Sequence, residues 1–110
     1  MIVTIWNNGT PRKNGGGYGL KLDVADRNRF FKRAWEFIIV ELEGSTQPVK
    51  VELTKRTFWG ATCREFVNPE IGLWLMRNGL STWPKGKPPK LILTLVRENR
   101  FMLMKSNVRY

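Results

Sequence analysis

A chain of 110 residues has room for one domain, 1–110, with a single core, and its 42% apolar and 25% charged residues are ordinary for a soluble protein. Nineteen Lys and Arg against nine Asp and Glu give a net charge of +10, so we expect an acidic partner. No apolar run approaches the roughly 20 residues that span a bilayer, so we expect no association with a membrane. Histidine is absent, which excludes the usual catalytic triads and most zinc sites. The single cysteine, Cys63, cannot form an internal disulfide, which favours a cytoplasmic location.

The first third of the sequence predicts a strand, a loop, a second strand and a helix. Residues 1–6 alternate apolar and polar side chains with β-branched types, as strands do. The glycine-rich sequence that follows predicts a flexible loop over about 7–17, and a short strand resumes at 20–23. A helix is expected over 23–35, with Asp23 as its N-cap residue.

The predicted helix is amphipathic. Its apolar residues lie roughly on one face, which we expect to pack on the core: Val24, Phe31, Ala34 and Trp35. Its basic residues lie largely elsewhere: Arg27, Arg29, Lys32 and Arg33.

The middle third predicts a β-hairpin. Its strands are 35–44 and 48–59, joined by a polar connection that contains Gly44. Residues 56–67 carry no consistent periodicity and are ambiguous between helix, strand and loop.

The last third predicts a helix and two strands. The helix at 68–79 has the clearest boundaries, because Asn68 suits the N-cap and Pro69 the first helical position. Two apolar strands follow at 90–96 and 100–104.

The order of these elements predicts the fold class. Few strands alternate one-to-one with helices, so a doubly wound parallel sheet is not expected. We expect a mainly β domain with two short helices, folded as a small open β-barrel or pseudobarrel of mostly antiparallel strands.

Motifs for cofactors and catalysis are missing from the sequence. No Gly-Lys-Ser/Thr exists for a P-loop, and Leu20 stands where the dinucleotide pattern needs its third glycine. Glu41 and Glu43 share one strand face and approach Glu52 across the hairpin, an arrangement more typical of a solvated face than of a magnesium site. We therefore expect no cofactor, no metal and no enzymatic activity.

The basic residues are concentrated in the outer thirds of the chain. Residues 1–34 hold seven basic and two acidic residues, 35–76 hold four and six, and 77–110 hold eight and one. Basic side chains near aromatics and loops are typical of nucleic-acid contact. Four clusters supply the candidate contacts: Arg12, Lys13 and Asn14; Arg27, Asn28, Arg29, Lys32 and Arg33; Lys55 and Arg56; Trp83, Lys85, Lys87 and Lys90.

The residue types suggest different roles for these clusters. Arginine and asparagine can form paired hydrogen bonds to base edges, whereas lysine acts as a mobile point charge for phosphates. The prolines around Lys85 and Lys87 favour an extended loop that loses little entropy on binding, although a solvated strand connection fits the same residues. Trp83 packs under this loop or stacks on a base, and core packing is favoured.

The arrangement from GYGLKLDVADRNRFF through WEFIIVELEG to NPEIGLWLMRNGL and the final strands, 18–104, resembles the DNA-binding pseudobarrel. That domain occurs in plant transcription factors and as the recognition module of some restriction endonucleases. The resemblance implies an open barrel that binds duplex DNA without catalysis, through two arms that grasp the major groove. It would place residues 11–14 and 26–29 on one arm, and residues 54–59 or 83–90 on the other.

The sequence thus predicts a non-catalytic nucleic-acid-binding domain, with duplex DNA as the expected partner. The resemblance alone implies a restriction or defence system as the setting. An RNA or single-strand binding barrel is one alternative, which exposed aromatics such as Tyr18, Phe58 and Trp83 would favour. A basic protein-interaction subunit of a larger complex is another, with the strand 100–104 adding to a partner sheet.

Overall fold

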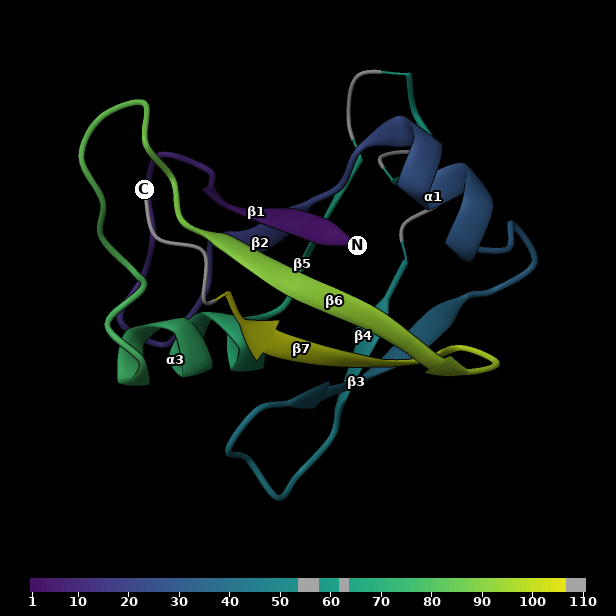
Figure 1. Ribbon diagram of the computed structural model, residues 1–110. Helices are drawn as coiled ribbons and strands as arrows, with labels where there is room; N and C mark the ends of the chain where they lie inside the picture. The colour runs from purple at the N-terminus through teal and green to yellow at the C-terminus, as the bar shows by residue number, and fades with distance from the viewer. Residues whose placement is uncertain (54–57, 62–63, 107–110) are drawn as a thin grey trace.

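The computed structural model describes residues 1–53, 58–61 and 64–106 and shows a mainly β protein with two helices (Figure 1). The strands are β1 (Ile2–Asn7), β2 (Tyr18–Lys21), β3 (Phe37–Leu42), β4 (Val49–Glu52), β5 (Glu65–Val67), β6 (Lys90–Arg97) and β7 (Arg100–Lys105). The helices are α1 (Val24–Phe30) and α3 (Pro69–Arg77). No helix in the described ranges is long and apolar enough to cross a membrane.

All seven strands belong to one sheet that curls into a nearly closed barrel. Their order is β4-β3-β7-β6-β1-β2-β5, and every neighbouring pair is antiparallel except β3 and β7, which are parallel. The edge strands β4 and β5 lie beside each other, and the Asn68 side-chain amide donates to the Lys50 carbonyl at 3.1 Å across the gap. The predicted fold class, a small open barrel of mostly antiparallel strands, is confirmed.

The core fills the inside of the barrel with alternate residues of each strand. Val3 and Ile5 of β1, Leu91 and Leu93 of β6, and other inward residues are fully buried. Phe31 stacks on Phe101, with ring centroids 4.7 Å apart. Each such side chain contributes about 1.5–3 kcal/mol on burial, so these residues set the register of the sheet.

The helix α3 begins and ends where local sequence predicts. The Asn68 side chain accepts hydrogen bonds from the backbone N–H of Glu70 (2.8 Å) and of Ile71, and Pro69 occupies the first position. The buried Trp74 donates its indole N–H to the Glu43 carbonyl at 2.8 Å, which fixes the helix to the end of β3.

The helix α1 is shorter than the predicted 23–35. It ends at Phe30, because Phe31 takes an extended backbone (φ −117°, ψ 144°) that turns its ring onto Phe101. Ala34, expected on the buried face, is therefore exposed beyond the helix. Asp23 precedes the helix as predicted, but its side chain makes no capping hydrogen bond.

The loop between β1 and β2 packs against α3. A Cβ atom on the buried Gly15 would lie 2.0 Å from the Pro69 carbonyl oxygen, and one on Gly72 would lie 2.1 Å from the Gly15 carbonyl oxygen. Only glycine permits this approach, and Gly15 also has a positive φ of 89°. These glycines serve backbone packing, whereas the sequence had suggested loop mobility alone.

The middle of the chain differs from the prediction in the second strand of the hairpin and in the segment that follows it. The strand expected over 48–59 ends at Glu52, and residues 54–57 lie outside the described ranges. The ambiguous segment 56–67 contains β5, whose three residues are too short to show a strand periodicity.

Candidate nucleic-acid interface

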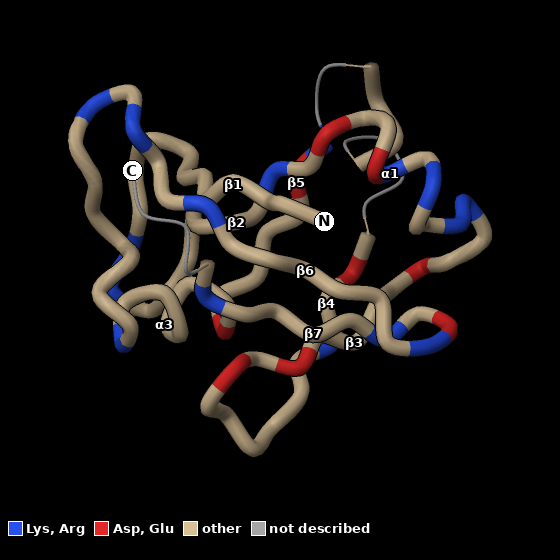
Figure 2. The backbone as a smooth tube through the Cα atoms, viewed as in Figure 1, with Lys and Arg blue, Asp and Glu red and all other residues tan. Residues whose placement is uncertain are grey.

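The topology gathers the candidate basic residues at two ends of the barrel. Thr4 of β1 lies opposite Lys90 of β6, so the loop after β1 and the loop before β6 leave the same end of the sheet. At the other end, β2 leads into α1, and β5 begins opposite Lys21. Figure 2 shows basic residues on the loop before β6 at one side of the view and on and after α1 at the other.

We call the first group the lysine-loop end and the second the arginine end. The lysine-loop end consists of Arg12, Lys13, Asn14, Trp83, Lys85, Lys87 and Lys90. The arginine end consists of Arg27, Asn28, Arg29, Lys32, Arg33 and Arg64. Lys55 and Arg56 lie outside the described residues.

This grouping differs from the arms that the pseudobarrel resemblance implied. Residues 11–14 and 26–29, expected on one arm, lie at opposite ends of β2 (Figure 1). Residues 11–14 instead share an end with 83–90, because β1 and β6 are antiparallel neighbours. The expected pairing is therefore wrong for the described residues.

The loop before β6, residues 81–89, which we call the lysine loop, is anchored at both sides and turns sharply at its tip. The Ser81 carbonyl accepts a hydrogen bond from the Tyr18 hydroxyl at 3.1 Å, and the Pro89 carbonyl accepts one from the Ile5 N–H at 3.1 Å. Between them, the Lys87 N–H donates to the Pro84 carbonyl at 2.9 Å, and Gly86 takes a φ of 77°. The tip is thus a tight turn, not the fully extended form suggested by the prolines, and it holds Lys85 and Lys87 in solvent.

The other members of this end have mixed roles. Lys90 donates from its ammonium group to the Thr4 hydroxyl at 3.0 Å, which ties the charge to the sheet. The Asn14 side-chain oxygen accepts from the Gly16 N–H at 3.0 Å and shapes the glycine loop. Trp83 is partly buried against the core, as favoured from the sequence, whereas Arg12 and Lys13 are exposed.

Arg27 is buried, which the pattern of basic residues in the sequence does not predict. It is only 4% exposed and donates to the carbonyl oxygens of Phe58 (2.9 Å) and Gly60 (2.6 Å). Its guanidinium therefore holds residues 58–60 against α1 and is not available to a partner. The pKa of Arg27 is lowered by burial and, to a smaller extent, by the nearby charges of Arg33 and Arg64.

The other arginine-end cations are more open. Arg29, Lys32 and Arg33 are exposed, as is Asn28, whose side-chain oxygen accepts from Arg27 at 3.3 Å. The Arg33 guanidinium carbon lies 4.7 Å from the centroid of the Trp59 ring, and that of Arg27 lies 5.2 Å from the same centroid. Within the described part of the chain, the buried Trp59 N–H has no hydrogen-bond partner, so packing and these cation contacts position the indole.

Three basic residues of the structure were not among the candidates that the sequence suggested: Arg64 at the arginine end, and Arg97 and Arg100 at the turn between β6 and β7. Arg64 lies in the ambiguous segment, and its side chain donates to the Leu22 carbonyl beside the start of α1. Arg97 and Arg100 flank the turn between β6 and β7, which the sequence presented only as a strand connection. The Asn99 side chain donates to the Phe37 carbonyl at 3.1 Å and places this turn beside the start of β3. No periodicity marks such residues, because only the sheet pairing brings them together.

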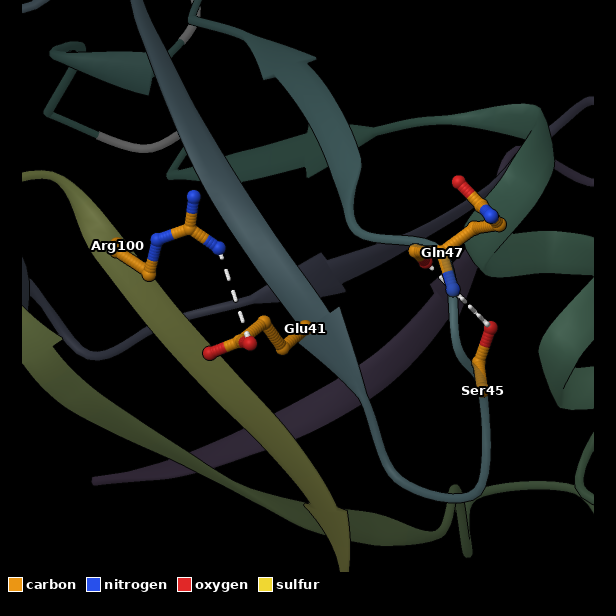
Figure 3. Close-up of polar contacts among 4 residues, drawn as sticks. All are labelled: Glu41, Ser45, Gln47 and Arg100. Carbon is orange, nitrogen blue, oxygen red and sulfur yellow. Dashed lines mark hydrogen bonds and ion pairs between the residues drawn. The ribbon is translucent and has the colours of Figure 1, made fainter.

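The acidic residues form no metal-binding cluster in the part of the chain that the structure describes. Glu41 pairs with Arg100 at 3.7 Å, and the Ser45 hydroxyl accepts from the Gln47 N–H at 3.4 Å in the following turn (Figure 3). Glu52 lies opposite Phe37 and not opposite Glu41, which separates the three carboxylates considered from the sequence.

The chain was compared with protein-family models, with curated proteins and with solved structures, and no family model, curated protein or solved structure matches it.

Proposed function

We propose that this domain binds nucleic acid without catalysis and that duplex DNA is its partner. One observation supports this most directly: among the described residues, most of the exposed cations lie at the lysine-loop end and the arginine end, and none of those forms an ion pair with a carboxylate. Among the described residues the only ion pair joins Arg100 of β7 to Glu41 of β3, neither of which is a candidate contact. Unpaired surface cations at net charge +10 attract a polyanion and release its counterions on contact.

The aromatic residues favour a duplex over a single strand. Proteins that bind single strands stack bases on exposed aromatic rings. Here Tyr18 is 5% exposed and Phe58 is fully buried, and Trp83 is packed against the core. The basic ends therefore offer charge and hydrogen-bond donors but few open stacking surfaces.

The resemblance to the DNA-binding pseudobarrel gives this proposal its biological setting. The barrel class agrees with that resemblance, although many functions share small barrels. A role as the recognition subunit of a restriction or defence system follows from the resemblance alone.

A salt titration tests the proposal. Binding of the protein to matched duplex DNA, single-stranded DNA and duplex RNA is measured by fluorescence anisotropy from low to moderate salt. We expect duplex DNA to bind most tightly, with an affinity that falls by a log–log slope of about 0.9 for each phosphate contacted. Tighter binding to single strands or to duplex RNA would contradict the choice of partner, and no binding at low salt would contradict nucleic-acid binding altogether.

A protein-interaction role is the second candidate, because one row on the outside of the barrel is apolar. Ile2 (56% exposed), Ile92 and Met104 (40% exposed) lie side by side across β1, β6 and β7. If the protein binds none of the three nucleic acids, the protein-interaction role is favoured, with this row as its contact surface.

A further inference from the structure

Three arginines of the arginine end lie close together: Arg27, Arg33 and Arg64. Arg27 and Arg33 both lie close to the Trp59 ring, at 5.2 and 4.7 Å from its centroid. Arg64 is near enough to repel Arg27 electrostatically. Within residues 1–53, 58–61 and 64–106, none of the three forms an ion pair with a carboxylate. A Glu65 carboxylate oxygen accepts from the Arg64 backbone N–H at 3.0 Å but is not in an ion pair with any of the three guanidinium groups. Like charges gathered without an ion-pair partner favour binding of an anion from outside.

The three arginines have different degrees of freedom. Arg27 is buried, and its hydrogen bonds to the carbonyl oxygens of Phe58 and Gly60 provide dipoles but no negative charge. Arg64 is partly exposed, and its Nε donates to the Leu22 carbonyl. Arg33 is exposed, so it is the member that can contact a ligand directly.

Trp59 prepares Arg33 for this contact. A guanidinium that lies over an aromatic ring keeps its in-plane N–H donors available while it loses rotational freedom. Because Arg27 holds the residues on both sides of Trp59 through the Phe58 and Gly60 carbonyls, the ring has a fixed place beside α1. The entropy cost of ordering Arg33 is thus reduced before a ligand arrives.

We propose that Arg33, positioned over Trp59 and reinforced by the charges of Arg27 and Arg64, binds a phosphodiester oxyanion of the nucleic-acid backbone. This inference rests on the proposed function, and it assigns the phosphate contact to a particular side chain. The guanidinium fork of arginine suits the paired oxygens of a phosphate. Arg27 and Arg64 act here as positioning and background charges, not as ligand contacts.

The test compares Arg33→Gln with Arg77→Gln, which removes the same charge from an exposed arginine on α3. We expect Arg33→Gln to weaken duplex binding about tenfold and to lower the salt slope by about 0.9, the value for one lost phosphate contact. Arg77→Gln should change affinity less than twofold. Equal effects of the two variants would reduce the role of Arg33 to net charge and overturn the inference.

A direct probe separates the possible sources of the phosphate group. Inorganic phosphate and a short duplex are titrated separately into ¹⁵N-labelled protein at constant ionic strength, and the arginine Nε–Hε resonances are followed. The inference requires that the resonance missing from Arg33→Gln shifts with the duplex. A shift with inorganic phosphate alone, with duplex affinity unchanged in Arg33→Gln, would indicate a free-phosphate site and overturn the phosphodiester assignment.

Failure of the proposed function would look different. If the wild-type protein binds no nucleic acid at low salt, the general proposal fails, whatever inorganic phosphate does. If it binds duplex DNA and Arg33→Gln binds equally well with an unchanged slope, nucleic-acid binding stands and only the Arg33 site is wrong.

Discussion

At the scale of single residues, identical residue types have opposite roles within one turn of α1. Arg27 is buried and bound to two carbonyls, whereas Arg29 is exposed and lies over the Phe30 ring at 5.2 Å. Helical spacing did not distinguish them, because a buried arginine requires acceptors from elsewhere in the chain. Phe58 and Gly60 supply those acceptors, and they lie more than thirty positions later in the sequence.

Replacement of Arg27 therefore tests stability. Arg27→Met keeps an apolar stem but leaves the Phe58 and Gly60 carbonyls without their donor, so we expect a loss of about 2 kcal/mol in the free energy of unfolding. Arg29→Met, the matched exposed change, should stay within about 0.5 kcal/mol. Urea denaturation of both variants measures the difference, and equal midpoints would show that the two carbonyl bonds contribute little.

The lowered pKa of Arg27 has a definite sign for stability. A base whose pKa falls on folding is less easily protonated in the folded state, so this group favours the fold more as the pH rises into its alkaline titration range. Arginine keeps its proton at physiological pH in both folded and unfolded states. Arg27 therefore makes no contribution to the pH dependence of stability near neutrality.

At the scale of elements, the sequence predicted those helix boundaries that neighbouring residues determine. The helix α3 was predicted because Asn68 and Pro69 define its start without help from the rest of the protein. The end of α1 was not predictable, because it depends on Phe31 reaching Phe101 from β7. The parallel pairing of β3 with β7, and the position of β5 at the sheet edge, likewise arise from long-range packing.

The contact between α3 and the glycine loop gives an element-scale prediction. Alanine normally stabilises a helix interior by about 1 kcal/mol relative to glycine. In Gly72→Ala the new methyl group would meet the Gly15 carbonyl oxygen at 2.1 Å, so we expect a net loss of about 1–3 kcal/mol from overpacking.

Thermal or urea unfolding of Gly72→Ala should be read against Gly16→Ala. At Gly16 the nearest atom to a new Cβ is the Asn14 side-chain oxygen at 3.1 Å, which moves more easily than a backbone carbonyl. We expect Gly16→Ala to cost less. A Gly72→Ala variant as stable as wild type would show that the loop moves away from α3 without cost.

At the scale of the whole molecule, the candidate basic residues of the two outer thirds of the sequence lie at two ends of the barrel and not on one face. β1 and β6, which come from these two thirds, are antiparallel neighbours, and the candidate cations lie beyond opposite ends of this strand pair (Figure 2). The Cα atoms span 35 × 31 × 29 Å. A duplex turn of about 10 base pairs is roughly 34 Å long, so both ends can contact one duplex only if it covers about one turn.

Duplex length therefore tests whether both ends act together. We expect affinity to rise until the duplex reaches about 10 base pairs and then to change only with the number of overlapping sites. The double variants Arg29→Gln/Lys32→Gln and Lys85→Gln/Lys87→Gln should each lower the salt slope by about 1.8 on a longer duplex, because each removes two phosphate contacts. Their effects on binding free energy should add, since the ends share no side-chain contact among the described residues.

On a duplex of half a turn, only one pair at a time can engage the DNA, so combining the two double variants should reduce the binding free energy by less than the sum of their separate effects. If one pair leaves the slope unchanged at every length, that end of the barrel lies off the DNA, and binding occurs through the other end alone.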